Sequence, residues 1–325
     1  MTDKKKYLYG PVPSRRLGRS YGIDIVPFKV CTLDCVYCQL GRTLVKTDER
    51  KDYAPIDVVL AELKGALAEN VEADFITIAG SGEPTLHAQL GRLIDGIKEI
   101  TNIRTAVLTN GTLLYRPDVR ADCAKADVVM PSLDAGDEQT FEKINRPCRD
   151  ISIENLISGL CKLREEYAGQ IWLEVFLIEP INTGTEQIAR IKDAIERIKP
   201  DKIHLNTAVR PTAEPGIRRL DAGQLEEIAV RLGPNCEVIA DFPASRSETS
   251  VPMDSQEIIA PHHISSAEAA AVLSMLERRP CSLKDICAGL GIRRNEALKH
   301  IRDLQRRGLI RSEVKDGNVF FKSPS

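Results

Sequence analysis

The sequence has no long apolar run. Its longest apolar stretch, at 171–178, is interrupted by a charged residue and falls far short of the roughly 20 residues that cross a bilayer. The first ten residues contain lysines with no apolar run behind them, unlike a secretory signal. These absences predict a cytoplasmic protein that does not enter a membrane.

A strong net charge is also lacking. The formal net charge is -2, so the chain as a whole is not a polyanion binder. The charge is uneven, because residues 262–325 contain 12 Lys and Arg against 7 Asp and Glu, whereas the rest of the chain contains 33 against 40. This asymmetry predicts that any polyanionic partner binds the C-terminal part alone.

Disulfide chemistry is not expected. The nine cysteines are an odd number and no export signal accompanies them. In a reducing compartment such residues are metal ligands, catalytic groups or buried apolar side chains. Six are scattered, but Cys31, Cys35 and Cys38 lie close together. Thiolates at this spacing indicate a soft metal ion or an iron–sulfur centre.

The number of cysteines in this motif narrows its chemistry. Electron-transfer clusters and structural zinc sites use four protein ligands, whereas three leave one position open for another molecule. A zinc site completed by a remote residue such as Cys148 is the alternative, and it predicts a binding protein without iron. No second pair of closely spaced cysteines of the CxxC type occurs, so an auxiliary cluster is not expected.

From residue 21 to about residue 243 the chain alternates β-branched runs with amphipathic patterns. The predicted strands cover 22–26, 74–79, 103–108, 127–133, 171–178, 202–207 and, more weakly, 236–241. The clearest predicted helices cover 56–69, 90–100, 153–166 and 185–198. Alternation of this kind predicts an α/β fold with a parallel sheet, either open or closed into a barrel.

A second unit follows a break in this pattern. Residues 244–264 are rich in Ser, Pro and polar residues and predict a linker. Three helical patterns and an alternating stretch around the Asp316-Gly317 turn come next. This order is typical of a winged helix-turn-helix domain, which we place at 265–325. Residues 1–20 are left as an N-terminal segment and 21–243 as the α/β domain.

Polar or glycine-rich segments follow the predicted strands, and the cysteine motif follows the first of them. These segments lie at 80–85, 109–111, 132–134, 179–182 and 206–210. Ligands of parallel α/β folds bind beyond the C-terminal ends of the strands. The segments and the cysteines are therefore predicted to share one rim.

Residues 31–38, CTLDCVYC, resemble the CxxxCxxC signature of the radical S-adenosylmethionine (SAM) superfamily. The turns GSGEPT at 80–85 and TNG at 109–111 fall where members carry SAM-contacting turns. The resemblance covers about residues 20–240 and implies a partial (β/α)6 barrel. It further implies a [4Fe-4S] cluster on Cys31, Cys35 and Cys38, with SAM bound to the fourth iron. The implied reaction is reductive cleavage of SAM to a 5′-deoxyadenosyl radical, with an electron donor such as flavodoxin or ferredoxin.

The resemblance also implies roles for other side chains. Glu83 is expected to pair with the SAM ammonium, Asn110 to bind ribose hydroxyls, and Gly82 to allow a close backbone approach. Ser81 departs from the usual Gly-Gly-Glu turn, which affects the expected backbone geometry. The remaining candidates for cofactor binding are Tyr37, Ser132 and Asp134.

The N-terminal segment resembles that of an uncharacterised "Fe–S oxidoreductase" branch of the superfamily, some members of which carry a similar winged helix. Its Ser14, Arg15 and Arg16 are expected to cover the open barrel, to hold an anionic group, or to form a solvated basic segment. Wyosine-synthesising tRNA enzymes resemble the core too, but they carry additional N-terminal cysteines, and none precedes Cys31 here. A wyosine activity is therefore not expected.

Several questions stay open at this level. The third helix of the small domain, with Arg293, Arg294, Lys299 and His300 among its residues, is expected to bind nucleic acid or to dock a peptide. Glu174 interrupts an apolar strand and either meets a ligand or pairs with a basic residue. The main hypothesis is a radical SAM enzyme acting on a nucleic acid, peptide or small molecule. The alternative is an Fe–S redox-sensing regulator that binds nucleic acid.

Overall fold

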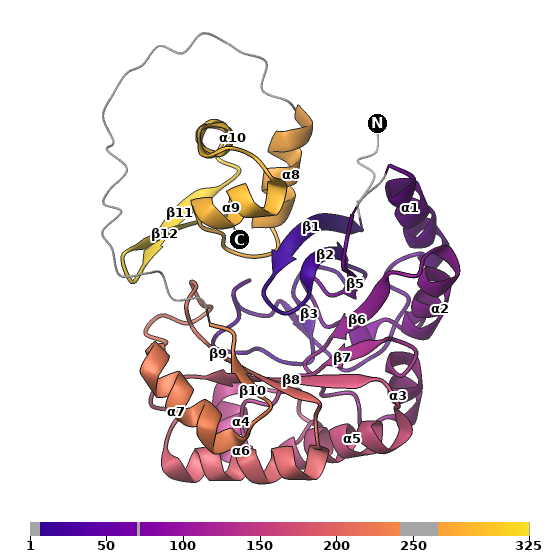
Figure 1. Ribbon diagram of the computed structural model, residues 1–325, viewed down its shortest axis with the longest axis vertical. Coiled ribbons are helices and arrows are strands. Elements are labelled where there is room, and N and C mark those ends of the chain that lie inside the picture. Colours follow the sequence, from indigo (N-terminus) through magenta and orange to yellow (C-terminus); the bar gives the residue numbers. More distant parts are fainter. Residues whose placement is uncertain (1–6, 70–71, 241–265, 325) are drawn as a thin grey trace.

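The computed structural model describes residues 7–69, 72–240 and 266–324. They form an α/β part, up to residue 240, and a smaller C-terminal unit of three helices and a hairpin (Figure 1). The expected linker at 244–264 lies outside the described residues. None of the described helices combines the length and the apolar character needed to cross a membrane.

One sheet of eight strands organises the α/β part, in the order β1-β2-β5-β6-β7-β8-β9-β10. Strand β1 (Leu8–Ser14) runs antiparallel to β2 (Gly18–Ile23), and the later pairings are parallel. The other strands are β5 (Phe75–Ile78), β6 (Arg104–Leu108), β7 (Val128–Met130), β8 (Gln170–Leu177), β9 (Lys202–Thr207) and β10 (Cys236–Val238). Within the described residues the edge strands β1 and β10 do not pair. The predicted partial barrel is confirmed.

Helices connect the strands and cover the outer face of the sheet (Figure 1). They are α1 (Ile56–Ala68), α2 (Leu90–Ile100), α3 (Pro117–Cys123), α4 (Glu138–Asn145), α5 (Ile153–Glu166), α6 (Thr185–Ile198) and α7 (Ala222–Leu232). Strand β8 shows how the two faces divide, because successive side chains point to opposite sides. Leu173 and Val175 join the core under the helices, whereas Trp172 and Phe176 belong to clusters on the inner face.

The turn between β1 and β2 crosses the open side of the barrel. Arg15 donates to the backbone carbonyl of Ile239, just beyond β10, and Arg16 pairs with Glu174 on β8. Leu17 packs among inner-face residues of β5 to β8. The expectation that this segment covers the open barrel is confirmed. Of the two roles expected for Glu174, pairing with a basic residue is the one observed.

The C-terminal unit has the predicted winged helix-turn-helix layout. Its elements are α8 (Ser266–Leu276), α9 (Leu283–Leu290), α10 (Arg294–Arg306), β11 (Arg311–Lys315) and β12 (Asn318–Lys322). The Ser282 side chain caps α9, and Gly291 ends it with a φ of 65°, which favours glycine. Val272, Ile286 and Ile301, one from each helix, are buried in a separate small core.

Candidate functional site

The three clustered cysteines lie in one loop beyond the end of β2. Strand β3 (Val30–Cys31) ends at Cys31 and pairs with β4 (Val45–Lys46), which closes the loop. Inside it, the Cys38 N–H donates to the Cys35 carbonyl at 3.1 Å. All three cysteines are free and half-buried.

Each of these sulfurs accepts a hydrogen bond from a different side chain. The donor–sulfur pairs are Asn110 Nδ2 to Cys31 Sγ (3.5 Å), Asn145 Nδ2 to Cys35 Sγ (3.4 Å) and Lys29 Nζ to Cys38 Sγ (3.1 Å). Hydrogen bonds to the ligand sulfurs orient them and tune the potential of an iron–sulfur cluster. The surroundings of the loop therefore suit thiolate ligands.

Burial opposes ionisation of the thiols when no metal is bound. It raises the pKa of Cys31 to about 12 and the pKa of Cys35 well above its ordinary value. Metal binding would release these protons. In the described part of the chain, no three His, Cys, Asp or Glu side chains are grouped as ligands of one metal ion. The ligands of a polynuclear cluster bind different irons, and three thiols with their own N–H donors fit that chemistry.

Glu83 joins two turns of the rim. It precedes the short 3-10 helix η1 (Pro84–Leu86) and is buried. Its carboxylate accepts from the N–H and hydroxyl of Thr85 (3.1 and 2.6 Å), the hydroxyl of Thr109 (2.5 Å) and the N–H of Asn110 (2.8 Å). Burial raises the pKa of Glu83, and these hydrogen bonds oppose the rise. Oε1 accepts three of these bonds and Oε2 only that of Asn110, so Oε2 keeps an acceptor position with which it can bind an ammonium.

Asn110 is turned toward the cysteine loop. Its Nδ2 donates to the Thr32 hydroxyl at 2.7 Å, and its Oδ1 accepts from the N–H and hydroxyl of Thr112 at 3.0 and 2.7 Å. The Thr32 and Thr112 hydroxyls also contact each other at 2.7 Å. Both polar atoms of Asn110 are thus engaged by protein, and the side chain positions Cys31.

Tyr37 and Asp134 contact each other. The Tyr37 hydroxyl donates to Asp134 Oδ2 at 2.5 Å, and the Tyr37 ring stacks on Phe176 with centroids 3.9 Å apart. Asp134 also accepts from Asn145 Nδ2 at 2.8 Å and from the Phe176 N–H at 3.0 Å. Burial raises the pKa of Asp134 to about 6. This carboxyl connects the cysteine loop to strand β8 and to the end of helix α4.

The turn at Ser81 and Gly82 lies against the start of the cysteine loop. A Cβ at Gly82 would be only 2.5 Å from the Val30 carbonyl oxygen. The Ser81 hydroxyl donates to Asp24 Oδ2 at 2.7 Å, and the Ser81 carbonyl accepts the Lys29 N–H at 2.8 Å. The close approach expected at Gly82 is therefore an approach to the chain's own backbone.

Ser132 lies on the inner wall of the barrel. It forms a parallel bridge with Glu174. Asn206 Nδ2 donates to Glu174 at 2.9 Å on the other side. Burial raises the pKa of Glu174, but the charge of Arg16 and the hydrogen bonds of Asn206 and Arg16 outweigh it, so the pKa falls below its ordinary value. Glu174 is therefore an ionised, paired carboxylate of the wall.

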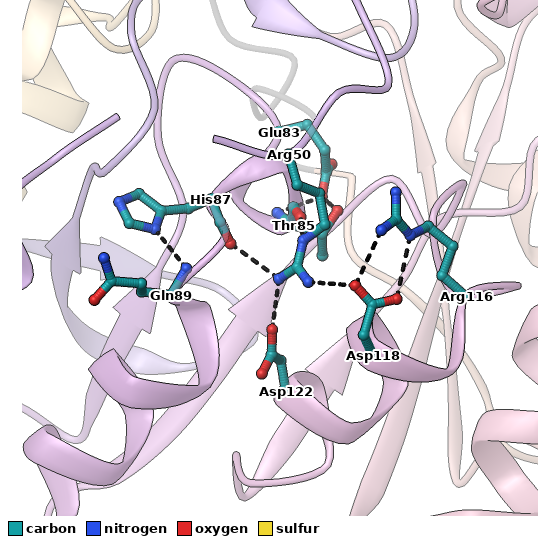
Figure 2. A network of polar contacts seen from close by, with 8 residues as sticks. All are labelled: Arg50, Glu83, Thr85, His87, Gln89, Arg116, Asp118 and Asp122. Atoms are coloured by element: carbon teal, nitrogen blue, oxygen red, sulfur yellow. Dashed lines mark hydrogen bonds and ion pairs between the residues drawn. The ribbon is translucent and has the colours of Figure 1, made fainter. Parts of the chain in front are cut away.

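A polar network that sequence reasoning did not single out holds η1 in place (Figure 2). Arg50 donates to the backbone carbonyls of Thr85 and His87, each at 3.0 Å. It also donates to Asp118 and Asp122 of helix α3, at 2.7 and 2.5 Å. Half of the groups that accept from Arg50 are backbone carbonyls, which a sequence motif does not identify. The sequence therefore gave no indication of this role of Arg50.

The remaining cysteines lie outside the loop. Cys148, the residue suggested as a remote zinc ligand, is half-buried after α4, and its N–H donates to the Thr32 carbonyl at 2.9 Å. Cys123 and Cys281 are buried, whereas Cys161, Cys236 and Cys287 are half-buried.

The third helix of the winged unit presents basic side chains to solvent. The exposed basic residues of α10 and of the two positions that flank it are Arg293, Arg294, Lys299, Arg302, Arg306 and Arg307. His300 does not belong with them, because it is buried with its Nε2 3.2 Å from Glu268 Oε2. Helix α10 lies on the side away from the α/β part, whereas α8 and α9 contact β1 (Figure 1).

A partial barrel with a three-cysteine loop at its rim defines a class of iron–sulfur proteins that use SAM. Residues 25–190 match the sequence profile of the radical SAM superfamily, and residues 264–313 match that of a helix-turn-helix domain. A UPF0026 protein of Synechocystis is 38% identical over 205 residues, covering 63% of this chain and 76% of the relative. The chain belongs to the radical SAM superfamily and, within it, to the UPF0026 proteins.

The chain aligns with only part of the length of two other relatives. A UPF0026 protein of Methanocaldococcus jannaschii is 38% identical over 213 residues, covering 65% of this chain and 66% of the relative. A Brachyspira hyodysenteriae protein named GTPase Obg is 35% identical over 314 residues, covering 97% of this chain. The aligned region spans only 45% of that protein.

Solved structures share the fold at low sequence identity. A structure of TYW1 with a lysine-pyruvate adduct bound has a TM-score of 0.51 at 20% identity, covering 71% of this chain and 78% of that chain. Streptococcus suis SuiB bound to SAM has a TM-score of 0.51 at 18% identity, covering 68% and 50%. These likenesses show the radical SAM fold alone.

Proposed function

We propose that this protein is a radical SAM enzyme that holds a [4Fe-4S] cluster on Cys31, Cys35 and Cys38. The reduced cluster would supply the electron that cleaves SAM to methionine and a 5′-deoxyadenosyl radical, which takes a hydrogen atom from the substrate. The observation that carries the proposal is the loop of three thiols, each with its own N–H donor, at the C-terminal rim of a partial barrel.

The side chains around the loop have separate tasks in this proposal. Lys29, Asn110 and Asn145 orient the ligand sulfurs and stabilise their negative charge. Glu83 fixes the turns on either side of the SAM site by joining residues 83–85 to 109–110. The candidate contacts for SAM are Tyr37, Ser81, Gly82, Glu83, Asn110, Ser132 and Asp134.

The interior of the barrel is the proposed place for the substrate. Its wall carries the ionised Glu174 between Arg16 and Asn206, beside apolar residues such as Met130 and Trp172. The β1–β2 turn closes one side and limits access of water to the radical. An external one-electron donor such as flavodoxin or ferredoxin would reduce the cluster.

The proposal is tested by anaerobic reconstitution of the full chain with iron and sulfide. After reduction and addition of SAM, we expect about four irons per chain and slow formation of 5′-deoxyadenosine without added substrate. Cys35→Ala is expected to lose both. Cys161→Ala is the matched control, because Cys161 is half-buried on α5 outside the loop, and it is expected to keep both.

The possible results separate the competing interpretations. A bound cluster with intact SAM would favour a redox-sensing regulator. Zinc in place of iron would favour a structural metal site. Cleavage of SAM that survives in the Cys35→Ala variant would refute the ligand assignment.

A further inference from the structure

The winged unit packs beside the open side of the partial barrel. Helices α8 and α9 contact β1 (Figure 1), and Val12 of β1 packs on the core of the winged unit. An ion pair between Arg210, after β9, and Asp285 of α9 joins the two parts at 3.3 Å. The small unit therefore contributes side chains to the edge of the proposed substrate chamber.

The loop between α8 and α9 brings Arg278 against the barrel. Its guanidinium carbon is 4.4 Å from the ring centroid of Tyr9 in β1, and its Nε is 3.8 Å from Asp24 Oδ2. The same Asp24 oxygen accepts the Ser81 hydroxyl at 2.7 Å. The Asp24 carboxylate thus lies between Arg278 and Ser81 of the glycine-rich turn and contacts both.

Arg279, the next residue, has a guanidinium with no carboxylate at ion-pair distance among the described residues. Its Nη2 is buried and has no hydrogen-bond partner there. It lies near the thiol of Cys281, where burial raises the pKa to about 11, and this thiol is therefore neutral. Arg279 is half-buried, and its charge helps to lower the pKa of Asp285, but that carboxylate is already paired with Arg210. A partly buried guanidinium without an ion pair of its own is costly, because the charge loses part of its hydration.

The charges at the junction do not balance. Among the residues that the structure describes, Arg210, Arg278 and Arg279 are matched by two carboxylates, Asp24 and Asp285. Guanidinium groups bind phosphate and carboxylate oxygens through paired N–H donors. An oxyanion would satisfy both the excess charge and the unused Nη2.

We propose that the junction between the barrel and the winged unit binds an oxyanion, a phosphate or carboxylate group of the substrate, with Arg279 as its main ligand and Arg278 beside it. This rests on the proposed function in one respect, because the anion is assigned to the molecule on which the barrel acts. The winged unit is then part of the substrate site, in addition to any partner that binds α10.

The test measures binding to the full chain with its cluster reconstituted, anaerobically and without SAM or reductant. Pyrophosphate and succinate are titrated separately by calorimetry. We expect one of them to bind with one site per chain, and Arg279→Gln to weaken this binding tenfold or more. Arg302→Gln removes the same charge from the exposed face of α10 and is expected to change affinity less than twofold.

The choice of probe separates the two sources of the anion. Tighter binding of pyrophosphate supports a phosphate, and tighter binding of succinate supports a carboxylate. Arg279→Lys keeps the charge without the paired donors and is expected to bind several-fold more weakly than wild type. Iron content and the melting temperature of each variant check that it folds.

The proposal is overturned if neither probe binds the wild type at millimolar concentration. It is also overturned if Arg279→Gln, or Arg279→Lys should the glutamine variant not fold, binds like wild type. Formation of 5′-deoxyadenosine is measured in parallel. Its absence from the wild type would contradict the proposed function, whereas the anion site is judged on the binding data.

Discussion

Lys29 is a buried lysine, 4% exposed, whose ammonium lies against the Cys38 sulfur at 3.1 Å. Its backbone N–H donates to the Ser81 carbonyl, and its own carbonyl accepts from Leu44 and Val45. The backbone therefore fixes where the charge lies. A positive charge beside a ligand sulfur stabilises the extra electron of a reduced cluster.

Lys29→Met keeps much of the side-chain volume and removes this charge. We expect the variant to assemble the cluster but to lower its reduction potential. At a given potential, the ratio of reduced to oxidised cluster should fall roughly tenfold, which corresponds to about 59 mV for one electron. The measurement is a redox titration followed by electron paramagnetic resonance. Lys64→Met, on the exposed face of α1, is the control, and an equal shift in both variants would contradict the assigned role.

Asp134 predicts a pH dependence of stability. Burial raises its pKa from 3.8 to about 6, so the folded state binds the proton more tightly than the unfolded state does. The stabilising contribution of Asp134 is then complete below about pH 4 and is lost as the pH rises through about 6. Relative to Asp134→Asn, the wild type is expected to lose about 3 kcal/mol in the free energy of unfolding over this interval.

The measurement is urea unfolding of the metal-free wild type and variant between about pH 4 and pH 7. Asp193→Asn, which removes an exposed carboxyl on α6, serves as the control. If the difference in the free energy of unfolding between the wild type and Asp134→Asn does not change with pH, the pKa of Asp134 is not raised in the folded state.

The sequence indicated the proposed cysteine ligands more readily than the side chains that donate hydrogen bonds to them. The spacing of Cys31, Cys35 and Cys38 predicted a shared thiol site, and the structure places all three in one loop. Lys29 and Asn145 were missed, because a donor to sulfur carries no spacing rule and Asn145 comes from α4, over 100 positions away. Asn110 was expected at the rim, but its contacts with Thr32 and the Cys31 sulfur were not, since a sequence shows that a side chain is at the rim and not which way it turns.

At the scale of elements, the sharpest requirement is the contact between the turn at Gly82 and the start of the cysteine loop. A Cβ at position 82 would lie 2.5 Å from the Val30 carbonyl oxygen, and a backbone atom cannot move aside as a flexible side chain can. The same carbonyl accepts the Glu83 N–H at 3.0 Å. The conformation of the turn at Gly82 and the position of the start of the cysteine loop therefore depend on each other.

Gly82→Ala is expected to push these two segments apart. We predict a loss of about 1–3 kcal/mol in stability and clearly reduced iron content after reconstitution, measured by iron analysis and thermal unfolding. Gly184→Ala is a matched control, because no atom lies within 4 Å of its added Cβ and its φ of -64° suits alanine. Full iron content in the Gly82→Ala variant would show that the rim tolerates the shift.

Element prediction succeeded where the periodicity was long. Helices α2, α5 and α6 occupy the predicted ranges, and α1 differs by one residue. The first strand was placed at 22–26 but β2 covers Gly18–Ile23, and β1 was not anticipated. Gly10, Pro11 and Pro13 interrupt the sequence of β1, so no alternation of apolar and polar residues marked this hairpin.

At the scale of the whole molecule, the arrangement of the winged unit decides which surface is available to a partner. The wing is engaged by the barrel, since Asp316 at its tip pairs with Arg219 at 3.0 Å. Helix α10 has its basic residues exposed on the opposite side. A nucleic acid would therefore be bound mainly through α10, without the contact that a free wing makes.

This arrangement gives a prediction for salt dependence. If Arg293 and Arg294 bind phosphates of duplex DNA, replacing both with Gln should weaken binding at every sequence tested. The slope of log affinity against log salt concentration should become shallower by about 0.9 for each lost contact, or about 1.8 for the pair. Lys64→Gln with Lys143→Gln, two exposed lysines of the α/β part, removes the same charge and should leave the slope unchanged. The measurement is fluorescence anisotropy over a range of salt concentrations, and an unaltered slope in the arginine variant would indicate that α10 docks a peptide, because peptide binding releases few condensed counterions.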